Sequence, residues 1–449
     1  MGAPIDKELV AAEAITAVET GISERDALNR MSEKYNITDW RIRGAIHSLV
    51  FETLRRLNTI DLLIKNSLEK GTIDKLYPLL RNLLRIGVYI LKSPQLNVPP
   101  PKITSFIVEV SKDRFGESVS KFTNALLRKI ENMKLDDLIT DSTDIEKLSF
   151  QYNHPIWFIE YLIDLIGFPD TIKFLKKSIE ENGFYIRVNT LKTDLSSVVD
   201  LLEREEFTFS VDQDLPDVIA ISRWKYPIMR STLNEEGLIY VQDKASALIS
   251  HVINPQEGDI IFDLCAAPGG KSMHLGQLLQ NTGMILSIDR SSRRLLELST
   301  KLSKYGLRNI YVINAVGENG PKYIRERADK VLIDPPCSGT GTFDSRPYSK
   351  WKFQMKELEI LTSIQWKLLI AAEKTLKSSG EIVYSTCSIT LEENEHLIKK
   401  FLRVFPDFTL VPATPFIGVP GFLGLSETQR LYPYLHDTEG FFIAKLKRE

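Results

Sequence analysis

Three cysteines, Cys265, Cys337 and Cys387, are the side chains of this sequence best suited to covalent chemistry. Their wide spacing contains no C-x-x-C or H-x-x-x-H pair, so it indicates neither a disulfide framework nor a metal site such as zinc. Cys337 and Cys387 each follow a short apolar run that is typical of a buried strand. A single buried cysteine is commonly a small apolar residue without chemistry, but two at neighbouring strand ends favour nucleophilic catalysis.

The two cysteines belong to a segment after Gly237 in which short strands alternate with helices. Such alternation is typical of an α/β fold with a doubly wound, mostly parallel sheet, in which ligands bind beyond the carboxyl ends of the strands. The predicted strands are Ile260–Leu264, Met284–Ile288, Ile310–Ile313, Val331–Ile333 and Ile382–Tyr384. Cys337 follows the fourth and Cys387 the fifth, so both are expected at the ligand-binding edge. Two later extended runs, 408–411 and 440–446, are expected to close the edge of the sheet as an antiparallel pair.

The loop from Asp263 to Ser272, which reads DLCAAPGGKS, joins a predicted strand to a predicted helix. Its adjacent glycines, Gly269 and Gly270, let the backbone approach a ligand closely, and a helix N-terminus favours a negative group such as a carboxylate. The ending Gly270-Lys271-Ser272 is also that of a phosphate-binding loop. The first glycine of that motif is missing, which disfavours a nucleoside triphosphate.

Asp289, at the end of the next predicted strand, narrows the choice of ligand. A carboxylate there can accept hydrogen bonds from both hydroxyls of an adenosine ribose, which dinucleotides and S-adenosylmethionine share. Because Pro268 interrupts the G-x-G-x-x-G pattern of a dinucleotide site, S-adenosylmethionine is preferred. The alternative without a ligand is that the two glycines merely make a tight turn and Asp289 caps the next helix.

The remainder of the chain is predicted to form two further domains. Apolar side chains at helical spacing from about residue 6 to 135 predict an all-helical domain over residues 1–145. Mixed helical and strand-like runs predict a small α+β linker domain over 146–235. The α/β catalytic domain is then expected over 236–449.

The charge of the chain does not decide whether it binds nucleic acid, but its cysteine content favours a location in the cytoplasm. The chain has 449 residues and a formal net charge of -2, which gives no whole-molecule argument for nucleic-acid binding. Lys and Arg outnumber Asp and Glu between residues 51 and 129, so this region is either a basic binding surface or a set of solvated helix faces. The sequence shows neither a signal peptide nor an apolar run of membrane-spanning length, and its sparse cysteines suit a reducing compartment. A cytoplasmic protein without a membrane partner is expected.

Taken together, these motifs resemble those of the RsmB/Sun (Fmu) family of RNA cytosine-5 methyltransferases. In the catalytic half the matching segments are residues 183–192, 237–246, 263–271, 334–341, 386–388 and 440–444. In the helical region, residues 79–91 and 122–130 resemble the NusB-like RNA-binding domain that precedes the catalytic part in one branch of the family. The resemblance covers essentially the whole chain. It implies a class I, Rossmann-like methyltransferase sheet preceded by an all-α NusB-like domain and a small α+β linker domain.

The resemblance also implies a covalent mechanism, since C5 of cytosine is a poor nucleophile until a thiolate adds to C6. It makes Cys387 the residue that attacks C6, and Asp334 the residue that hydrogen-bonds the N3 and N4 edge of the base. Cys337 is the cysteine associated with release of the product, and Lys271 is expected to approach the target base. If the substrate were DNA, the cysteine of the Pro-Cys pair, Cys337, would be the expected nucleophile instead.

The same resemblance assigns residues to S-adenosylmethionine. Cys265 is expected to contact it through its backbone and to have no covalent role. Asn314 stands where the family commonly has an acidic residue, and its amide oxygen is expected to accept the hydrogen bond of the adenine amino group. Arg294 is expected either to line the site or to be an ordinary surface arginine. The full expected set is Cys265, Ala266, Ala267, Pro268, Gly269, Gly270, Lys271, Asp289, Arg294, Asn314 and Asp334.

RNA is the partner that the resemblance implies. A base paired within a helix cannot reach such a site, so the target cytosine is expected to be single-stranded or flipped out. The NusB-like region favours ribosomal over transfer RNA by analogy, and phosphate contacts would supply salt-dependent affinity. The alternative from another class is a non-enzymatic RNA-binding protein whose methyltransferase domain is a scaffold, against which the intact Cys387, Cys337, Asp334 and Lys271 argue. The sequence predicts no particular oligomeric state.

Overall fold

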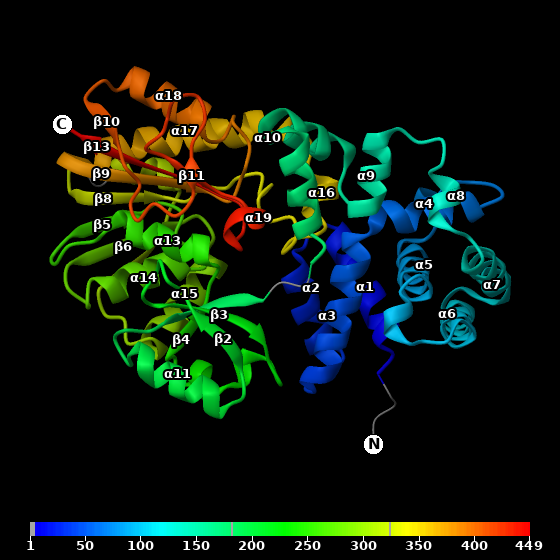
Figure 1. Ribbon diagram of the computed structural model, residues 1–449. Coiled ribbons are helices and arrows are strands. Elements are labelled where there is room, and N and C mark those ends of the chain that lie inside the picture. The colour runs from blue at the N-terminus through cyan, green and yellow to red at the C-terminus, as the bar shows by residue number, and fades with distance from the viewer. Residues whose placement is uncertain (1–4, 181–182, 323–324) are drawn as a thin grey trace. The chain divides into compact units, whose positions relative to one another are not determined.

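The computed structural model describes residues 5–180, 183–322 and 325–449, apart from the side chains of 320–322 (Figure 1). The chain forms two compact units, one of Met1–Ile179 with Phe343–Lys352 and one of Glu180–Thr342 with Phe353–Glu449. Compact units are a coarser division than domains. The predicted domains, 1–145, 146–235 and 236–449, therefore stay a prediction, with residues 1–4 outside the described part of the chain.

The first unit is helical, as its apolar periodicity predicts. Several helices begin with residues that satisfy free backbone N–H groups: the Ser23 hydroxyl accepts from the Asp26 N–H, and Thr143 and Glu146 form a reciprocal capping box. Its core consists mainly of Leu, Ile, Val and Ala side chains from α1 and α3–α7, together with Ala27 of α2, Ile37 and Tyr89. The helices are α1 (Lys7–Glu19), α2 (Glu24–Lys34), α3 (Trp40–Arg55), α4 (Leu57–Ser67), α5 (Pro78–Leu91), α6 (Pro100–Phe115), α7 (Glu117–Glu131), α8 (Leu135–Leu138), α9 (Asp144–Tyr152), α10 (Ile156–Lys177) and α16 (Ser349–Lys352).

The segment Phe343–Lys352 belongs to this helical unit although it follows Cys337 closely in sequence. Tyr348 and Trp351 pack against the helical core, and the Trp351 indole N–H donates to the Leu54 carbonyl oxygen at 2.7 Å. The sequence does not predict this placement, because it depends on contacts that the side chains of Tyr348 and Trp351 make with helices about three hundred positions earlier in the chain.

The second unit contains two sheets. The smaller is antiparallel with strand order β2-β3-β1-β4, made of β1 (Phe184–Val188), β2 (Thr208–Val211), β3 (Val218–Arg223) and β4 (Ile239–Val241). Helix α11 (Leu195–Arg204) buries Val198 and Leu202 in the apolar cluster of this sheet, and α12 (Thr232–Glu235) adds Leu233 to it. This is the α+β element that the sequence predicts ahead of the catalytic sheet.

The larger sheet has the order β11-β12-β13-β9-β8-β5-β6-β7, with β10 pairing β13 in addition. Strands β9, β8, β5, β6 and β7 are parallel to one another, whereas β13 pairs antiparallel with β9, β10 and β12, and β12 pairs antiparallel with β11. The strands are β5 (Ile260–Asp263), β6 (Met284–Asp289), β7 (Ile310–Asn314), β8 (Ala328–Ile333), β9 (Leu376–Thr386), β10 (Phe408–Val411), β11 (Val419–Pro420), β12 (Gln429–Leu431) and β13 (Phe441–Arg448).

Alternating side chains of these strands enter two different apolar clusters, as the two-residue period of a strand requires. Ile261 and Val383 join the cluster that includes residues of α13, α14 and α15, whereas Phe262 and Ile382 join the cluster with α17 and α18. The sheet is therefore covered on both faces, which Figure 1 also shows. The covering helices are α13 (Lys244–Ile253), α14 (Gly270–Leu278), α15 (Ser292–Lys304), α17 (Glu357–Thr375) and α18 (Glu395–Val404).

The predicted fold class is thus confirmed: a doubly wound, mostly parallel sheet follows an all-helical region and a small α+β element. The two late extended runs do pair antiparallel, as β10 and β13. However, β13 also pairs with β9 and with the short β12, so it lies inside the sheet. None of the described helices combines the length and the apolar character needed to cross a membrane.

Candidate active site

The candidate site residues follow strands that end at one edge of the large sheet. In the parallel register of β5 with β8, Asp263 lies opposite Leu332, and in that of β8 with β9, Ile333 lies opposite Tyr384. The loops that follow Asp263, Ile333 and Thr386 therefore leave the sheet at nearly the same level. Ligands of open α/β sheets bind beyond such carboxyl ends.

The predicted cofactor loop makes a tight turn between β5 and α14. Gly269 has a φ of 100°, and a Cβ at this position would stand 2.2 Å from Leu298 Cδ1. Helix α14 begins at Gly270, and the first N–H groups of a helix have no partner within the helix. The turn therefore packs closely on its inner side and presents a helix N-terminus, which suits a negatively charged group.

Asp289, the last residue of β6, holds this loop through main-chain contacts. Its carboxylate accepts from the Ala267 N–H at 3.1 Å and from the Ser291 N–H at 2.8 Å. The N-cap of α15 is Ser291, so the alternative that Asp289 caps this helix is wrong. Arg294 is exposed on α15, and its guanidinium also donates to the Ala267 carbonyl oxygen.

Asn314 ends the neighbouring strand β7. Its side-chain N–H donates to the Asp289 carbonyl oxygen at 3.0 Å, which orients the side chain and leaves its amide oxygen as the remaining acceptor. This geometry is compatible with the expected hydrogen bond from an adenine amino group. That contact, like the ribose contact of Asp289, stays a prediction.

Lys271 and Asp334 bring the cofactor loop and the β8 end together. The Lys271 Nζ donates to Asp334 Oδ2 at 2.6 Å, and the Ser385 hydroxyl reaches Asp334 Oδ1 at 3.3 Å. Burial acts to lower the pKa of Lys271, but the Asp334 carboxylate outweighs it and raises that pKa above its usual value. The ammonium therefore stays charged and holds the Asp334 carboxylate in place.

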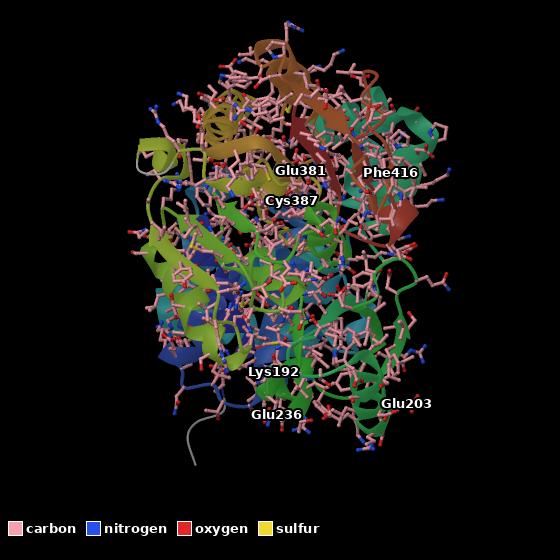
Figure 2. The ribbon with its side chains drawn as sticks, turned by 90° about the vertical axis from the view of Figure 1, so that its left-hand side faces the viewer. Lys192, Glu203, Glu236, Glu381, Cys387 and Phe416 are labelled. Atoms are coloured by element: carbon pink, nitrogen blue, oxygen red, sulfur yellow. The ribbon has the colours of Figure 1, made fainter. Side chains whose placement is uncertain are left out.

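Cys337 and Cys387 meet beside this ion pair. Their sulfur atoms lie 3.2 Å apart, and both thiols are free and partly exposed (Figure 2 labels Cys387). The hydrogen bond with Cys387 and burial raise the pKa of Cys337 well above its usual value. Cys337 therefore keeps its proton, and its S–H group can donate a hydrogen bond to the sulfur of Cys387.

Two comparisons of sequence bear on the identity of this site. The sequence model of a family described as 16S rRNA methyltransferase RsmB/F matches residues 250–447, and that of the NusB family matches residues 7–132. A Synechocystis protein named "Probable ribosomal RNA small subunit methyltransferase B" is 31% identical over 405 residues, which cover 89% of this chain and 90% of that protein. The chain belongs to the RsmB/F methyltransferase family.

Further comparisons agree with membership of the RsmB/F family. A Bacillus subtilis protein with the same name is 26% identical over 445 residues, which cover 98% of each chain. A solved structure described as "Crystal Structure of PH0851" superposes with a TM-score of 0.86 at 30% identity and covers 100% of both chains. The predicted family, with its NusB-like domain, and the predicted enzyme class of RNA (cytosine-C5)-methyltransferase are confirmed. A non-enzymatic protein is disfavoured.

Cys265 differs from the other two cysteines of this RsmB/F family member. Burial, together with the Asp263 and Asp334 carboxylates, raises the pKa of its thiol well above the usual value. A thiol of this kind is a poor nucleophile. The structure is thus compatible with the prediction that Cys265 has no covalent role.

Sequence reasoning missed several residues that shape the site. Ser385 reaches Asp334, and the buried residues Ser338, Ser388 and Glu393 lie beneath the two cysteines. A signal for Glu393 was present, because an acidic residue in the run Glu392-Glu393-Asn394-Glu395, directly before a helix, is a candidate for a buried or capping role. Two of the three partner residues of its carboxylate, Ser338 and Gln365, however, lie 55 and 28 positions earlier in the chain.

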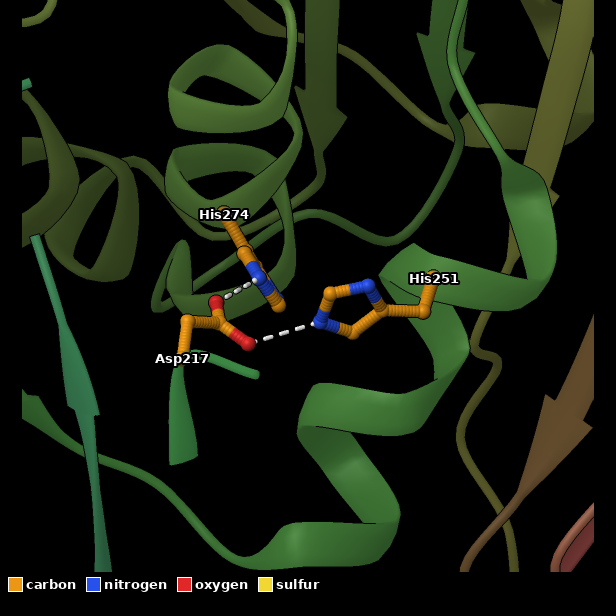
Figure 3. A group of neighbouring side chains, drawn as sticks. All are labelled: Asp217, His251 and His274. Atoms are coloured by element: carbon orange, nitrogen blue, oxygen red, sulfur yellow. Dashed lines mark hydrogen bonds and ion pairs between the residues drawn. The ribbon is translucent and has the colours of Figure 1, made fainter. Parts of the chain in front are cut away.

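A second cluster, Asp217, His251 and His274, has residue types that could bind a metal (Figure 3). One oxygen of the Asp217 carboxylate pairs with His251 Nε2 and the other with His274 Nε2, each at 2.8 Å. Burial and the cationic Arg187 lower the pKa of His274 to about 3, so its imidazole is neutral. The Asp217 carboxylate also compensates part of the free-energy cost of burying the Arg187 guanidinium. A divalent cation bound here would add further positive charge to an interior that already contains the Arg187 cation. The cluster is accounted for as a hydrogen-bonded contact between the small sheet and α13 and α14.

Proposed function

We propose that this protein transfers the methyl group of S-adenosylmethionine to C5 of cytosine in RNA, with Cys387 as the covalent nucleophile. The observation that carries the proposal is the 3.2 Å approach of the Cys337 and Cys387 sulfurs beside the Lys271–Asp334 ion pair. One thiol that keeps its proton, next to a second that can attack, is what a cycle of addition and elimination at C6 requires.

The cofactor loop supports S-adenosylmethionine as the methyl donor. The helix N-terminus at Gly270 suits a carboxylate, Asp289 suits the ribose hydroxyls, and the Asn314 amide oxygen suits an adenine amino group. When bound, S-adenosylmethionine supplies an electrophilic methyl group. The remaining loop contacts, from Cys265 to Lys271, are proposed to come mainly from the backbone.

The residues of the chain would then act in sequence on the base. Asp334, held by Lys271, would accept hydrogen bonds from N4 and protonated N3, which makes C6 electrophilic. The Cys387 thiolate would add to C6, and the electron pair at C5 would form the new bond to the methyl carbon while the carbon–sulfur bond of the donor breaks, its electron pair staying on the departing sulfur. Loss of the C5 proton to a base would restore the C5–C6 double bond and expel Cys387 as a thiolate. Cys337, 3.2 Å away, would donate its S–H hydrogen bond to that departing sulfur.

The proposed substrate is ribosomal RNA, since relatives that match nearly the whole chain are named ribosomal RNA small subunit methyltransferases. The target cytosine would be unpaired or flipped out, and the NusB-like helices would hold neighbouring phosphates. We place the reaction in the cytoplasm, where the thiols stay reduced.

The test is methyl transfer from labelled S-adenosylmethionine to an unmodified 16S rRNA transcript, followed by mapping of 5-methylcytosine. Cys387→Ala should abolish both incorporation and the covalent protein–RNA adduct. Cys337→Ala should leave an adduct that survives denaturing electrophoresis. No incorporation by folded wild-type protein would refute the proposal, and the reverse pattern of the two variants would exchange the roles of the cysteines. A matching DNA oligonucleotide serves as the control for RNA preference.

A further inference from the structure

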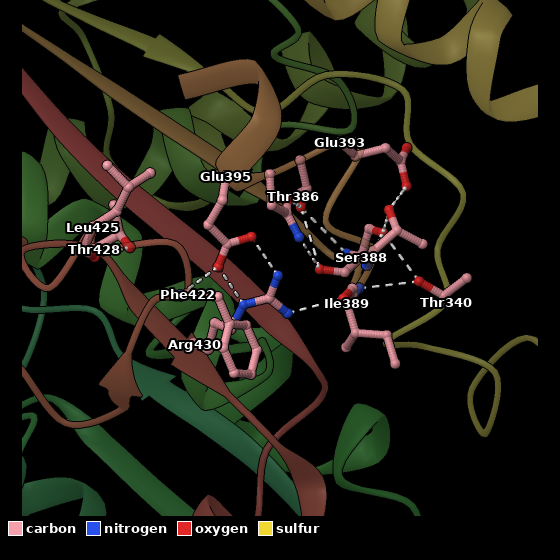
Figure 4. A network of polar contacts seen from close by, with 12 residues as sticks. Thr340, Thr386, Ser388, Ile389, Glu393, Glu395, Phe422, Leu425, Thr428 and Arg430 are labelled. Atoms are coloured by element: carbon pink, nitrogen blue, oxygen red, sulfur yellow. Dashed lines mark hydrogen bonds and ion pairs between the residues drawn. The ribbon is translucent and has the colours of Figure 1, made fainter. Parts of the chain in front are cut away.

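Glu393 is fully buried, and its carboxylate contacts the loops that carry the two cysteines. Figure 4 shows Glu393 in the same polar network as Ser388. Its Oε1 accepts from the Ser338 N–H at 2.8 Å and from the Gln365 side-chain N–H at 2.9 Å. Its Oε2 accepts from the Ser338 hydroxyl at 2.6 Å and from the Thr390 hydroxyl at 2.8 Å. Each carboxylate oxygen thus has two donors, which is the arrangement that an acceptor-only group needs when it is buried.

The residue that Glu393 holds most firmly is the neighbour of Cys337. Ser338 donates to it twice, once through the main chain and once through the side chain. The Ser338 hydroxyl also lies 3.0 Å from the hydroxyl of Ser388, the residue after Cys387. A single carboxylate therefore ties together the chain positions that directly follow both cysteines.

A second layer of contacts links the same two loops. The Thr340 hydroxyl lies 3.0 Å from the Ser388 hydroxyl and accepts from the Ile389 N–H at 3.0 Å. The Gly341 N–H donates to the Cys387 carbonyl oxygen at 3.0 Å. These contacts fix the main chain on either side of the cysteine pair, but none of them provides an acceptor for the Ser338 backbone N–H. Glu393 provides that acceptor.

We infer that Glu393 is a positioning residue for product release, because it sets the place of Cys337 relative to Cys387. The inference rests on the proposed function, in which Cys337 assists the departure of the Cys387 sulfur. Without Glu393, the Ser338 N–H loses its acceptor, and the loop after Asp334 keeps only the bond from the Gln365 side chain to the Pro336 carbonyl oxygen and the hydroxyl contacts of Ser338, so it can shift. A shift of this loop moves Cys337 away from Cys387, whereas Cys387 directly follows the central strand β9. Attack and methyl transfer should then suffer less than release.

The chemistry of the contacts separates two substitutions of Glu393. In Glu393→Gln, the amide oxygen can still accept from the Ser338 N–H and the Gln365 N–H, and the amide N–H groups can donate to the two hydroxyls. In Glu393→Ala all four contacts are lost. The glutamine variant should therefore retain most of the release rate, and the alanine variant should not.

The experiment follows two rates in one single-turnover reaction with the 16S rRNA transcript: methyl incorporation and disappearance of the adduct on a denaturing gel. For Glu393→Ala we expect adduct release to slow by about 10- to 100-fold while methyl incorporation slows by no more than about threefold, the scale at which a displaced catalytic group lowers a rate. Glu393→Gln should lie within about threefold of wild type in both rates. Ser338→Ala, a milder change that removes one hydroxyl, should show the same split with a smaller effect, and it decides the question if Glu393→Ala does not fold.

Glu395→Ala is the matched control. Glu395 is equally buried and only two residues away, but its carboxylate pairs with Arg430 and accepts from the Phe422 N–H, and it reaches the Cys387 loop only indirectly, through the Arg430 bond to the Ile389 carbonyl oxygen. It should lower thermal stability without selective loss of release. If Glu393→Ala and Ser338→Ala are folded and lower both rates equally, or leave release unchanged, the positioning role is refuted. Cys337→Ala is run in parallel: if it leaves no persistent adduct, the proposed function fails instead.

Discussion

The loop that is proposed to bind the cofactor and the loops that carry the cysteines lie at one sheet edge, and each rests on a fully buried carboxyl in a different setting. Asp263, beneath the cofactor loop, accepts from the Ser272 hydroxyl at 2.6 Å and more weakly from the Cys265 N–H at 3.4 Å. Burial and the nearby Asp334 carboxylate raise its pKa to about 7. Glu393, beneath the cysteines, has four donors within 2.9 Å.

This difference shows two ways of fixing a loop. The cofactor loop is held by its own main chain and by close packing, as with Gly269 against Leu298, so its carboxyl needs few partners. The cysteine loops come from chain positions fifty residues apart, and a side-chain network joins them in addition to the main-chain bond from the Gly341 N–H to the Cys387 carbonyl oxygen. The Lys271–Asp334 ion pair links the cofactor loop directly to the β8 loop that carries Cys337. A change to this ion pair should therefore affect both cofactor binding and the reaction at the base.

The largest effect is expected for Lys271→Met, which breaks this shared bond. The change keeps an unbranched apolar side chain, one heavy atom shorter, but leaves the Asp334 carboxylate without its 2.6 Å partner. We expect kcat/KM to fall by about 100-fold or more, because an unpaired charge near the base loses both orientation and compensation. This fall in kcat/KM is measured by steady-state methyl transfer at varied RNA and cofactor concentrations. Lys271→Arg should recover part of the rate, and a Lys271→Met enzyme within threefold of wild type would show that the ion pair is dispensable.

A smaller effect, confined to the cofactor side, is expected for Asp289→Asn. The single amide oxygen can accept from only one of the two main-chain donors, Ala267 or Ser291, and the side chain no longer offers a charged acceptor to the ribose hydroxyls. Because hydrogen bonds to charged groups contribute about 1.5–3 kcal/mol, the KM for S-adenosylmethionine should rise about 10- to 100-fold. The rate at saturating cofactor and the release of the adduct should stay near wild type. A fall in the saturated rate with an unchanged KM would contradict the assignment of Asp289 to the cofactor.

The same comparison explains what could be predicted from the sequence. Strand order and the carboxyl-edge rule are sufficient to bring Asp289, Asp334 and Cys387 to one place, because each residue ends or directly follows a strand. Glu393 could not be assigned in this way, since its contacts depend on how two loops turn after leaving the sheet. The short strands β11 and β12 were missed for a similar reason: they are two and three residues long and carry too little periodicity to be seen.

The smallest effect concerns Asp263 and appears as a dependence of stability on pH. Its pKa of about 7 in the folded protein lies above the value near 3.8 of the exposed group, so folding favours the protonated carboxyl. Its contribution to stability is therefore fully present below about pH 4 and is lost as pH rises through 7, by at most about 1.4 kcal/mol for each pH unit in that window. Asp263→Asn imitates the protonated form, since its amide can donate to Ser272 and accept from the Cys265 N–H.

Urea unfolding of both proteins at pH 5 and pH 8 measures this contribution. Asp263→Asn should gain stability relative to wild type between pH 5 and pH 8, because it has no proton to lose. If Asp263→Asn shows no such gain, the sparse donor set of Asp263 has no effect on stability and the contrast between the two loops fails. A gain would mean that the cofactor loop rests on an acid that is partly protonated near neutral pH.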